Sequence, residues 1–473
     1  MSLEPVAGAN RGTAALDDRR AAKAAQADQL DTEDALAQEF VRTHSKDFRY
    51  VPNFGWVRWS GHRWERDDKL RHFDAMRRIA RARGGDKPPG ESRRIASAKM
   101  VTAMAMLARS DPLLVRGVDE LDADPLSLNT PGGIVNLRLG DMRQHDRDLV
   151  TKATAVAPAF GDGCATWILF LEEIFEGEQE VIHFVRRFLG YCLTGLTREH
   201  VLGFFFGDGA NGKSTLLDFL QWLLGDYALK LPASVLMAQR GERHPTELAQ
   251  LRGIRIAVAS ELDEGVHWAE ARLKEITGDT TLTARFVRGD FFTFHLLCKI
   301  IIAGNHRPQM RSVDDALKRR LLLVPFKAKF MGERRDTQML DKLKAEGPAV
   351  LAWIICGCAE WLSNGLQVPA SIRAASDEYA TTMDVMGNWI ADCCYQSGDL
   401  LDTSEGSSRL YHSYADWKRR RGESPVSQTR WGEQMTGRGF EWYRNNGIRY
   451  HGIELTPAER ERIESVDRPK DER

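Results

Sequence analysis

A glycine-rich loop between two apolar segments is the part of this sequence whose residue types and spacing point most directly to chemistry. Glycines let backbone N–H groups surround phosphate oxygens, and the positive end of a following helix adds to this attraction. Lys213 is expected to reach the β- and γ-phosphates and Ser214 to coordinate Mg²⁺. The sequence therefore predicts binding of ATP or a related nucleotide together with Mg²⁺. The loop matches the P-loop pattern at every required position and consists of Gly207, Asp208, Gly209, Ala210, Asn211, Gly212, Lys213, Ser214 and Thr215.

Polar residues that follow later apolar runs are candidates for the rest of a catalytic site. Glu261 follows the run 255–260, where a P-loop ATPase places the acid that binds Mg²⁺ and orients water. Asp263 and Glu264 are competing acids, and the residues do not decide between Glu261 and Asp263. Asn305 follows the run 299–304 and suits a sensor of the γ-phosphate or of the attacking water.

Arg319 and Arg320 are candidates for an arginine finger, which stabilises charge on the transferred phosphoryl group. Taken alone, a basic pair is more often a solvated surface feature, and a single Asn is more often a turn residue. The order of P-loop, acid, hairpin, Asn and Arg pair is more specific than any one of these features. No NKxD motif for guanine follows, and small-molecule kinases lack this order.

The elements that must position these residues are those of an α/β fold. Apolar runs at 201–206, 255–260, 299–304 and 321–326 alternate with helical segments, which is typical of a mainly parallel sheet covered by helices. A helical stretch at 165–196 leads into the first run, and residues 280–294 have the pattern of a β-hairpin.

Composition narrows the class of protein. The chain has 473 residues and a net charge of -1, so nucleic-acid contacts must come from local basic patches and not from overall charge. Its 7 cysteines form no CxxC pair, which predicts buried thiols in a reducing compartment. No apolar run approaches the roughly 20 residues of a membrane span. We therefore expect a soluble, intracellular protein without membrane contact.

The order of motifs resembles that of superfamily 3 helicases, a branch of the AAA+ ATPases, and most of all the helicase half of phage, plasmid and poxvirus primase-helicases. Segments 129–140, upstream, and 410–417 and 450–453, downstream, are similar to the neighbouring domains of that family. The resemblance covers about residues 35 to 455. The core segments that carry it are 207–215, 259–261, 273–279, 284–285, 302–308 and 319–326.

This resemblance implies roles for individual residues and a division into domains. Lys213, Ser214, Glu261 and Asn305 would serve ATP hydrolysis, and Arg320, in preference to Arg319, would act on the ATP of a neighbouring subunit. The hairpin would enter a central channel, with Lys274, Arg285 and Arg288 close to DNA. The expected units are a disordered tail (1–31), an α+β N-terminal domain (32–160), the AAA+ domain (161–370), a winged-helix-like DNA-binding domain (371–458) and a charged tail (459–473).

The C-terminal segment has the order helix, helix, wing that is typical of DNA-binding domains. Arg430 and Gln434 would lie on one exposed face of the second helix. The ordinary alternative is a charged, solvated face on a small packing domain.

A primase domain, which such proteins often carry, is not expected here. Asp122 and Asp124 have the spacing of a metal-binding carboxylate pair, but Pro125 argues against the strand that such a pair needs. We expect no primer synthesis by this chain, with a separate primase and polymerase as its partners.

The favoured hypothesis is an ATP-dependent, ring-forming DNA helicase that translocates on single-stranded DNA and unwinds forked DNA during phage, prophage or plasmid replication. The resemblance implies that the ring is a homo-hexamer and that it works in the bacterial or phage-infected host cytoplasm. The alternative is a DNA-binding replication initiator that uses ATP as an assembly switch without unwinding. A P-loop kinase acting on a small molecule fits neither the hairpin nor the Arg pair.

Overall fold

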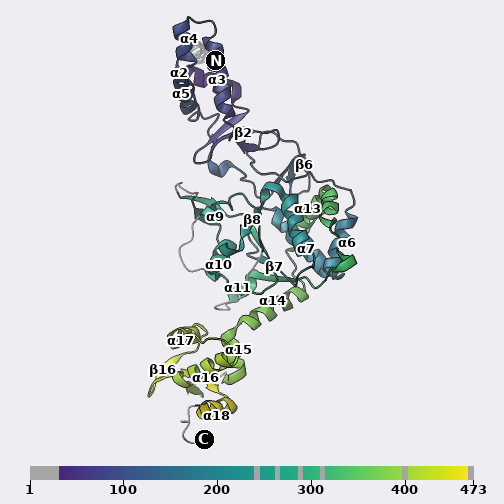
Figure 1. The fold of residues 1–473 in the computed structure, drawn as a ribbon, viewed down its shortest axis with the longest axis vertical. Helices are drawn as coiled ribbons and strands as arrows, with labels where there is room; N and C mark the ends of the chain where they lie inside the picture. Colours follow the sequence, from purple (N-terminus) through teal and green to yellow (C-terminus); the bar gives the residue numbers. More distant parts are fainter. Residues whose placement is uncertain are drawn as a thin grey trace, which may run out of the picture.

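A computed structural model describes residues 31–238, 246–260, 267–285, 291–308, 315–396 and 403–466. In Figure 1 these residues form an elongated molecule. An N-terminal unit, a central α/β unit and a C-terminal unit follow one another along its long axis. Of the expected tails, 1–30 and 467–473 lie outside the described residues.

The N-terminal unit combines a helical bundle with small antiparallel sheets, as expected for an α+β domain. The sheet orders are β1-β2-β3 and β4-β5-β6. The buried Asn129 joins this unit to the central one, because its backbone N–H donates to the hydroxyl of Tyr227 at 3.1 Å. The elements are α2 (Glu33–His44), β1 (Phe48–Val51), β2 (Gly55–Trp59), β3 (Trp64–Arg66), α3 (Arg71–Gly84), α4 (Pro89–Ile95), α5 (Ala98–Ala108), η1 (Val118–Glu120), β4 (Ser127–Thr130), β5 (Gly133–Asn136) and β6 (Met142–Arg143).

A five-stranded parallel sheet forms the centre of the molecule, which confirms the predicted mainly parallel core. The strand order is β13-β7-β12-β9-β8. Successive residues face opposite sides, so that Phe204 packs in one hydrophobic cluster and Phe205 in the other. Both faces are therefore buried, which explains why four of the strands are nearly continuous apolar runs. The fifth, β8, contains Lys230, is partly exposed and was not predicted. The strands are β7 (Leu202–Phe206), β8 (Ala228–Pro232), β9 (Ile256–Ser260), β12 (Lys299–Gly304) and β13 (Leu321–Pro325).

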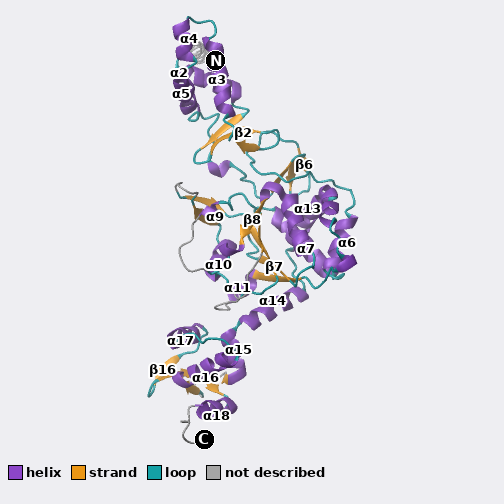
Figure 2. Cartoon of the chain, viewed as in Figure 1, coloured by secondary structure: helices purple, strands orange, loops and turns teal. Residues whose placement is uncertain are grey.

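Helices cover both faces of this sheet. In Figure 2, α6, α7 and α13 lie on one side of the strands and α10 and α11 on the other. The residues before the last strand, which include the arginine pair, form the short helix α11. The covering elements are α6 (Ala165–Ile174), α7 (Gln179–Leu193), α8 (Lys213–Leu224), η2 (Gly225–Tyr227), η3 (Ala233–Val235), α9 (Thr246–Ala249), α10 (Glu270–Gly278), β10 (Thr281–Ala284), β11 (Phe292–His295), α11 (Asp315–Arg320), η4 (Gly332–Arg334), α12 (Met339–Ala345), α13 (Gly347–Asn364) and α14 (Ala370–Met383).

None of the helices in the described ranges is by itself long and apolar enough to cross a membrane. The pair α12 and α13, bent by 74°, passes the same test of length and composition when taken together. Residues of α13 that include Leu351, Ile354 and Trp361 are buried in the core cluster shared with α7.

The C-terminal unit has its own hydrophobic cluster around Trp389, Trp431 and Tyr450. Its small sheets have the orders β14-β18 and β15-β17-β16. The elements are α15 (Val385–Cys393), β14 (Cys394–Gln396), β15 (Ser404–Gly406), α16 (Ser407–Arg420), α17 (Gln428–Gly437), β16 (Trp442–Arg444), β17 (Ile448–His451), β18 (Ile453–Leu455) and α18 (Pro457–Val466).

At both ends of the C-terminal unit, the packing of a helix differs from what the expected domain boundaries imply. Helix α14, which was assigned to the C-terminal domain, packs on β13, where the hydroxyl of Ser376 accepts from the N–H of Leu323 at 2.9 Å. Its Tyr379 is fully buried in the core of the central unit. At the other end, the segment expected to be a charged tail from 459 begins as helix α18. The buried carboxylate of Glu459 accepts there from the hydroxyl of Ser413 at 2.6 Å.

We predict that Gly190→Ala destabilises the central unit. Helix α7 crosses α13 at Gly190, where an added Cβ would lie 2.2 Å from the backbone N of Cys358. Such overpacking should lower the free energy of unfolding by about 1–3 kcal/mol, measured by thermal unfolding. Gly90→Ala in α4, with nothing within 4 Å of the added Cβ, is the control and should change stability by less than about 1 kcal/mol. Equal stability of the two variants would contradict this account of the crossing.

Candidate active site

The P-loop connects β7 to α8 and depends on glycine at two close approaches. At Gly207 an added Cβ would lie 2.2 Å from the carbonyl oxygen of Phe326. Gly212 has a φ of +85°, and its added Cβ would lie 2.6 Å from Cγ2 of Ile174. The loop is therefore pressed against the segment after β13 on one side and against α6 on the other. Side chains at these positions would force it open.

Lys213, the first residue of α8, is held inside this loop. Its ammonium donates to the carbonyl oxygen of Gly207 at 2.5 Å and to Oδ1 of Asn211 at 3.0 Å. Burial lowers the pKa of Lys213 to about 8. The amine is thus already placed among backbone groups that would surround a phosphate.

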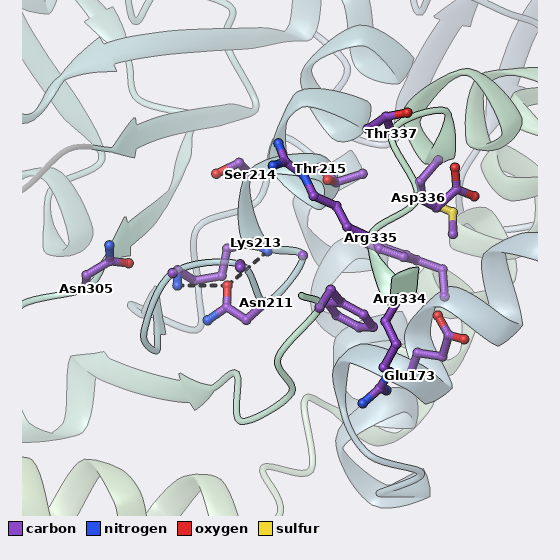
Figure 3. A pocket seen from close by; sticks show the side chains of 16 residues that line it. Glu173, Asn211, Lys213, Ser214, Thr215, Asn305, Arg334, Arg335, Asp336 and Thr337 are labelled. Carbon is purple, nitrogen blue, oxygen red and sulfur yellow. Dashed lines mark hydrogen bonds between the residues drawn. The ribbon is translucent and has the colours of Figure 1, made fainter. Parts of the chain in front are cut away.

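A pocket of about 670 Å³ opens beside the loop, a size suited to a nucleotide. Ser214 and Thr215 line it from the first turn of α8, and Asn305 lines it from the end of β12. Asn305 reaches the pocket because β12 pairs with β7 in parallel, and the N–H of Gly207 donates to the carbonyl of Gly304 at 3.4 Å. The structure thus brings together the predicted P-loop and the predicted sensor (Figure 3).

The segment after β13 lines the pocket as well, and the sequence analysis missed it. The N–H of Phe330 donates to the carbonyl of Ala210 at 2.7 Å, and Lys329 pairs with Asp208 at 3.2 Å. These contacts fix the segment along the P-loop, so that Arg334 and Arg335 line the pocket. In Figure 3, Arg335 extends toward the start of α8, whereas Arg334 extends away from it.

One signal could have revealed these arginines. Because β13 is parallel to β7, residues that follow its carboxyl end lie at the same edge of the sheet as the P-loop, where ligands of such sheets bind. The other pocket walls, Phe170 and Glu173 of α6 and Met339 of α12, had no comparable signal because nothing in a single sequence reports which helix packs beside the loop.

The predicted acids follow strand β9 in the sequence. Glu261, Asp263 and Glu264 lie outside the described residues. The described part of β9 ends at Ser260, and β9 pairs with β12 in parallel. Strand β12 therefore lies between the P-loop strand and the strand that precedes Glu261.

The arginine pair lies at the opposite edge of the sheet from the P-loop. Both residues end α11 and immediately precede β13, whose first residue pairs with Leu202 at the start of β7. Arg319 is exposed and Arg320 is half-buried, with Nη2 of Arg320 close to Gly278, where an added Cβ would lie 3.1 Å from it. At about 3.3 Å per residue, the length of β13 separates the pair from its own pocket by roughly 17 Å.

The predicted DNA-contacting hairpin is formed by β10 and β11. Arg285, which directly follows the first strand, is exposed and lies over the ring of Phe291 at 4.9 Å from its centroid. Lys274 is half-buried on α10. Arg288 lies outside the described residues. Neither Arg285 nor Lys274 lines the P-loop pocket.

The predicted residues of the C-terminal unit lie on α17. Arg430 is exposed in its first turn, where the hydroxyl of Ser427 caps the helix. Gln434 is half-buried. The described residues contain no cluster of three or more His, Cys, Asp or Glu side chains that could hold a metal ion, and all seven cysteines are free thiols.

Comparison with known proteins gives two family matches. The family described as "D5 N terminal like" matches residues 37–176, and the "Family of unknown function (DUF5906)" matches residues 205–320. The second match includes the P-loop, Asn305 and the arginine pair.

Individual relatives are viral proteins. The "Putative helicase L207/L206" of Acanthamoeba polyphaga mimivirus is 27% identical over 272 residues, which is 52% of this chain and 28% of that protein. "Primase D5" of Fowlpox virus is 26% identical over 152 residues, 31% of this chain and 19% of that protein. The chain thus spans less than a third of the length of these relatives.

A solved structure shares the fold. The A form apo structure of the NrS-1 C terminal region is 12% identical, with a TM-score of 0.53, and covers 90% of this chain and 99% of that one.

We predict that ATP binding takes up protons at alkaline pH. Phosphates favour the charged form of Lys213 and raise its pKa above the value of about 8 in the free protein. Affinity should therefore be greatest below about pH 8 and fall as the pH rises through it. Calorimetry in two buffers with different ionisation enthalpies should show proton uptake at about pH 8.5 and little at about pH 6.5. Equal affinity and no uptake at either pH would contradict the placement of Lys213 at the phosphates.

We also predict that Arg335 contacts phosphate. Arg335→Ala should weaken ATP binding about 10- to 100-fold, the loss expected for hydrogen bonds to a charged group, while adenosine binding is unchanged. Arg334→Ala is the matched control and should change ATP affinity by less than about threefold. Both are measured by equilibrium binding of a fluorescent nucleotide. Similar losses for the two variants would argue against a specific role of Arg335.

Proposed function

We propose that this chain, a distant homologue of viral proteins named as putative helicases and as a primase, is an ATP-driven DNA helicase of superfamily 3 that works as a ring. It would translocate on single-stranded DNA and unwind duplex during phage, prophage or plasmid replication. The observation that carries this proposal is the placement of the P-loop and the arginine pair at opposite edges of one parallel sheet. A single chain then carries the nucleotide-binding half of a hydrolytic site at one edge and the arginine half at the opposite edge.

One half binds the nucleotide. Backbone N–H groups of the P-loop and the ammonium of Lys213 hold the phosphates, and Asn305 orients the γ-phosphate or the attacking water. The glycine contacts, the buried Lys213 and the size of the pocket fit a nucleoside triphosphate. Ser214 and Glu261 would hold Mg²⁺, which neutralises charge on the β- and γ-phosphates when it is bound.

The other half comes from the neighbouring subunit. Arg320 cannot reach the pocket of its own chain along β13, so it acts on the ATP of the next chain in a ring. Head-to-tail contacts of this kind close into rings when the rotation between subunits permits. Arginine fingers stabilise the charge that develops during phosphoryl transfer, so hydrolysis requires assembly.

The edge of the sheet at which its strands begin, here called the amino edge, would connect this site to DNA. The base of the β10–β11 hairpin closes where the N–H of Leu296 donates to the carbonyl of Thr280 at 3.0 Å, just before β12 begins. We propose that the hairpin brings Arg285 and Arg288 into contact with the phosphate backbone, which suits tracking without sequence preference. Strand β12 runs from this hairpin to Asn305 at the phosphates.

The C-terminal unit is proposed to be a winged-helix DNA-binding domain. Its order of β15, α16, α17, β16 and β17, with β17 paired between β15 and β16, supports this assignment. Helix α17 would be the recognition helix and would present Arg430 to DNA, with Gln434 on the same face.

We predict that Arg320→Ala separates ATP binding from hydrolysis. The variant should bind ATP with unchanged affinity, because Arg320 lies at the opposite edge from the pocket, and should lose hydrolysis by a factor on the order of 10³. It should also fail to unwind forked DNA, as should Lys213→Ala. Arg319→Ala is the matched control and should keep at least about a tenth of the activity. The measurements are nucleotide affinity, ATPase rate and strand displacement.

Two results would contradict the proposal. Full ATPase activity of Arg320→Ala would show that Arg320 is not an arginine finger. Hydrolysis by the wild-type protein without strand displacement on any forked substrate would favour a replication initiator that uses ATP as an assembly switch.

A further inference from the structure

Helix α3 of the N-terminal unit carries a basic face that the proposed ATPase does not use. Its inward face is formed by the buried residues His72, Met76 and Ala80, which follow helical spacing. The opposite face carries four exposed arginines, and Asp74 is the acidic residue among them. The arginines of this α3 basic face are Arg71, Arg77, Arg78 and Arg81.

Only part of this charge is neutralised within the described residues. Arg78 pairs with Asp74 at 2.7 Å, and the side chain of Arg78 remains 79% exposed. In the described ranges, Arg77 and Arg81 form no ion pair. Between residues 69 and 99 the chain has ten lysines and arginines and three acidic residues, although its overall net charge is -1. Positive charge is therefore concentrated in residues 69–99, which include α3, and is not spread over the molecule.

The face is presented on a rigid support. The carboxylate of the buried Asp67 accepts from the backbone N–H groups of Arg71 and His72, both at 2.9 Å, and so caps the start of α3. The ring of His72 donates to the same carboxylate at 2.6 Å and stacks on Trp56. The arginines thus extend from a helix whose start is fixed, which lowers the entropic cost of binding.

We propose that the α3 basic face binds the phosphate backbone of DNA, as a second contact that is separate from the hairpin and the C-terminal unit. Arginine is the side chain best suited to phosphate because its planar group donates in pairs. The face spans about 15 Å from Arg71 to Arg81 at 1.5 Å per residue, enough to face several phosphates of a strand. The identity of the polyanion rests on the proposed function, which places this chain on DNA.

A membrane surface fits this helix poorly. Interfacial helices bury a free apolar face in lipid, but the apolar face of α3 is already packed against α2 and α5 in a core that includes Met76 and Ala80. In Figure 1 the unit lies at the end of the molecule opposite to the C-terminal unit. DNA contacts at both ends would give the ATPase a fixed orientation on a strand.

The test is the charge reversal Arg77→Glu with Arg81→Glu in the full chain. Its matched control is Arg138→Glu with Arg373→Glu, two exposed arginines in other parts of the chain, so that net charge changes equally. Binding of fluorescein-labelled single-stranded and forked oligonucleotides is measured by anisotropy between about 50 and 200 mM salt. We expect the α3 variant to bind DNA at least about tenfold more weakly. The slope of log affinity against log salt should fall by about 1.4 to 1.8, the loss of two phosphate contacts.

The outcomes separate this proposal from the proposed function. Equal affinities and equal salt slopes for the α3 variant and its control would overturn the α3 DNA site. The remaining partner that fits the α3 basic face would then be an acidic protein. No DNA binding by the wild-type chain overturns both proposals. DNA binding that depends on Arg77 and Arg81 without ATP-dependent unwinding supports the α3 site and overturns the helicase alone. ATPase activity without DNA should be the same in all three proteins, which shows that the variants are folded.

Discussion

The position of β12 between β7 and β9 is the constraint on which the rest of the structure depends. Its parallel pairing with both neighbours brings the P-loop, Asn305 and the carboxyl end of β9 to one edge of the sheet. Strand β13, parallel to β7 on the other side, brings Arg334 and Arg335 to the same edge. Residues separated by more than a hundred positions in the sequence thereby line one pocket.

The same parallel order brings two other features to the amino edge of the sheet. The arginine pair precedes β13 there, and the hairpin joins β12 there. The buried ammonium of Lys299 anchors this end of β12 by donating to the carbonyl oxygens of Thr194 and Leu297. A stiff, fully buried strand is the kind of element through which a change at the phosphates could move a DNA-contacting hairpin. In the proposed function, ATP hydrolysis and DNA contact are thus separated by the length of a strand and joined by it.

Four of the five strands of the parallel core were predictable because each is a nearly continuous apolar run, whereas β8 contains Lys230 and was missed. The P-loop was predictable because its residue spacing is specific. Asn305 followed from its position after such a run. By contrast, Arg334 and Arg335 depend on the course of an irregular segment held by Phe330 and Lys329, contacts that leave no periodic signal. Helix α14 was assigned to the wrong unit because its packing partner is fixed by tertiary contacts. The catalytic and DNA-binding roles of all the predicted residues, Glu261 and Arg288 included, remain predictions.

The central claim is that each hydrolytic site is shared between neighbouring chains, and mixing two inactive variants tests it most directly. Lys213→Ala removes the nucleotide-binding half and Arg320→Ala removes the finger, so neither protein should hydrolyse ATP alone. Mixed in equal amounts, they should regain a substantial share of wild-type ATPase activity, because some interfaces then combine an intact P-loop with an intact arginine. Activity that stays at the level of the separate variants, although the two proteins co-assemble, would contradict the account.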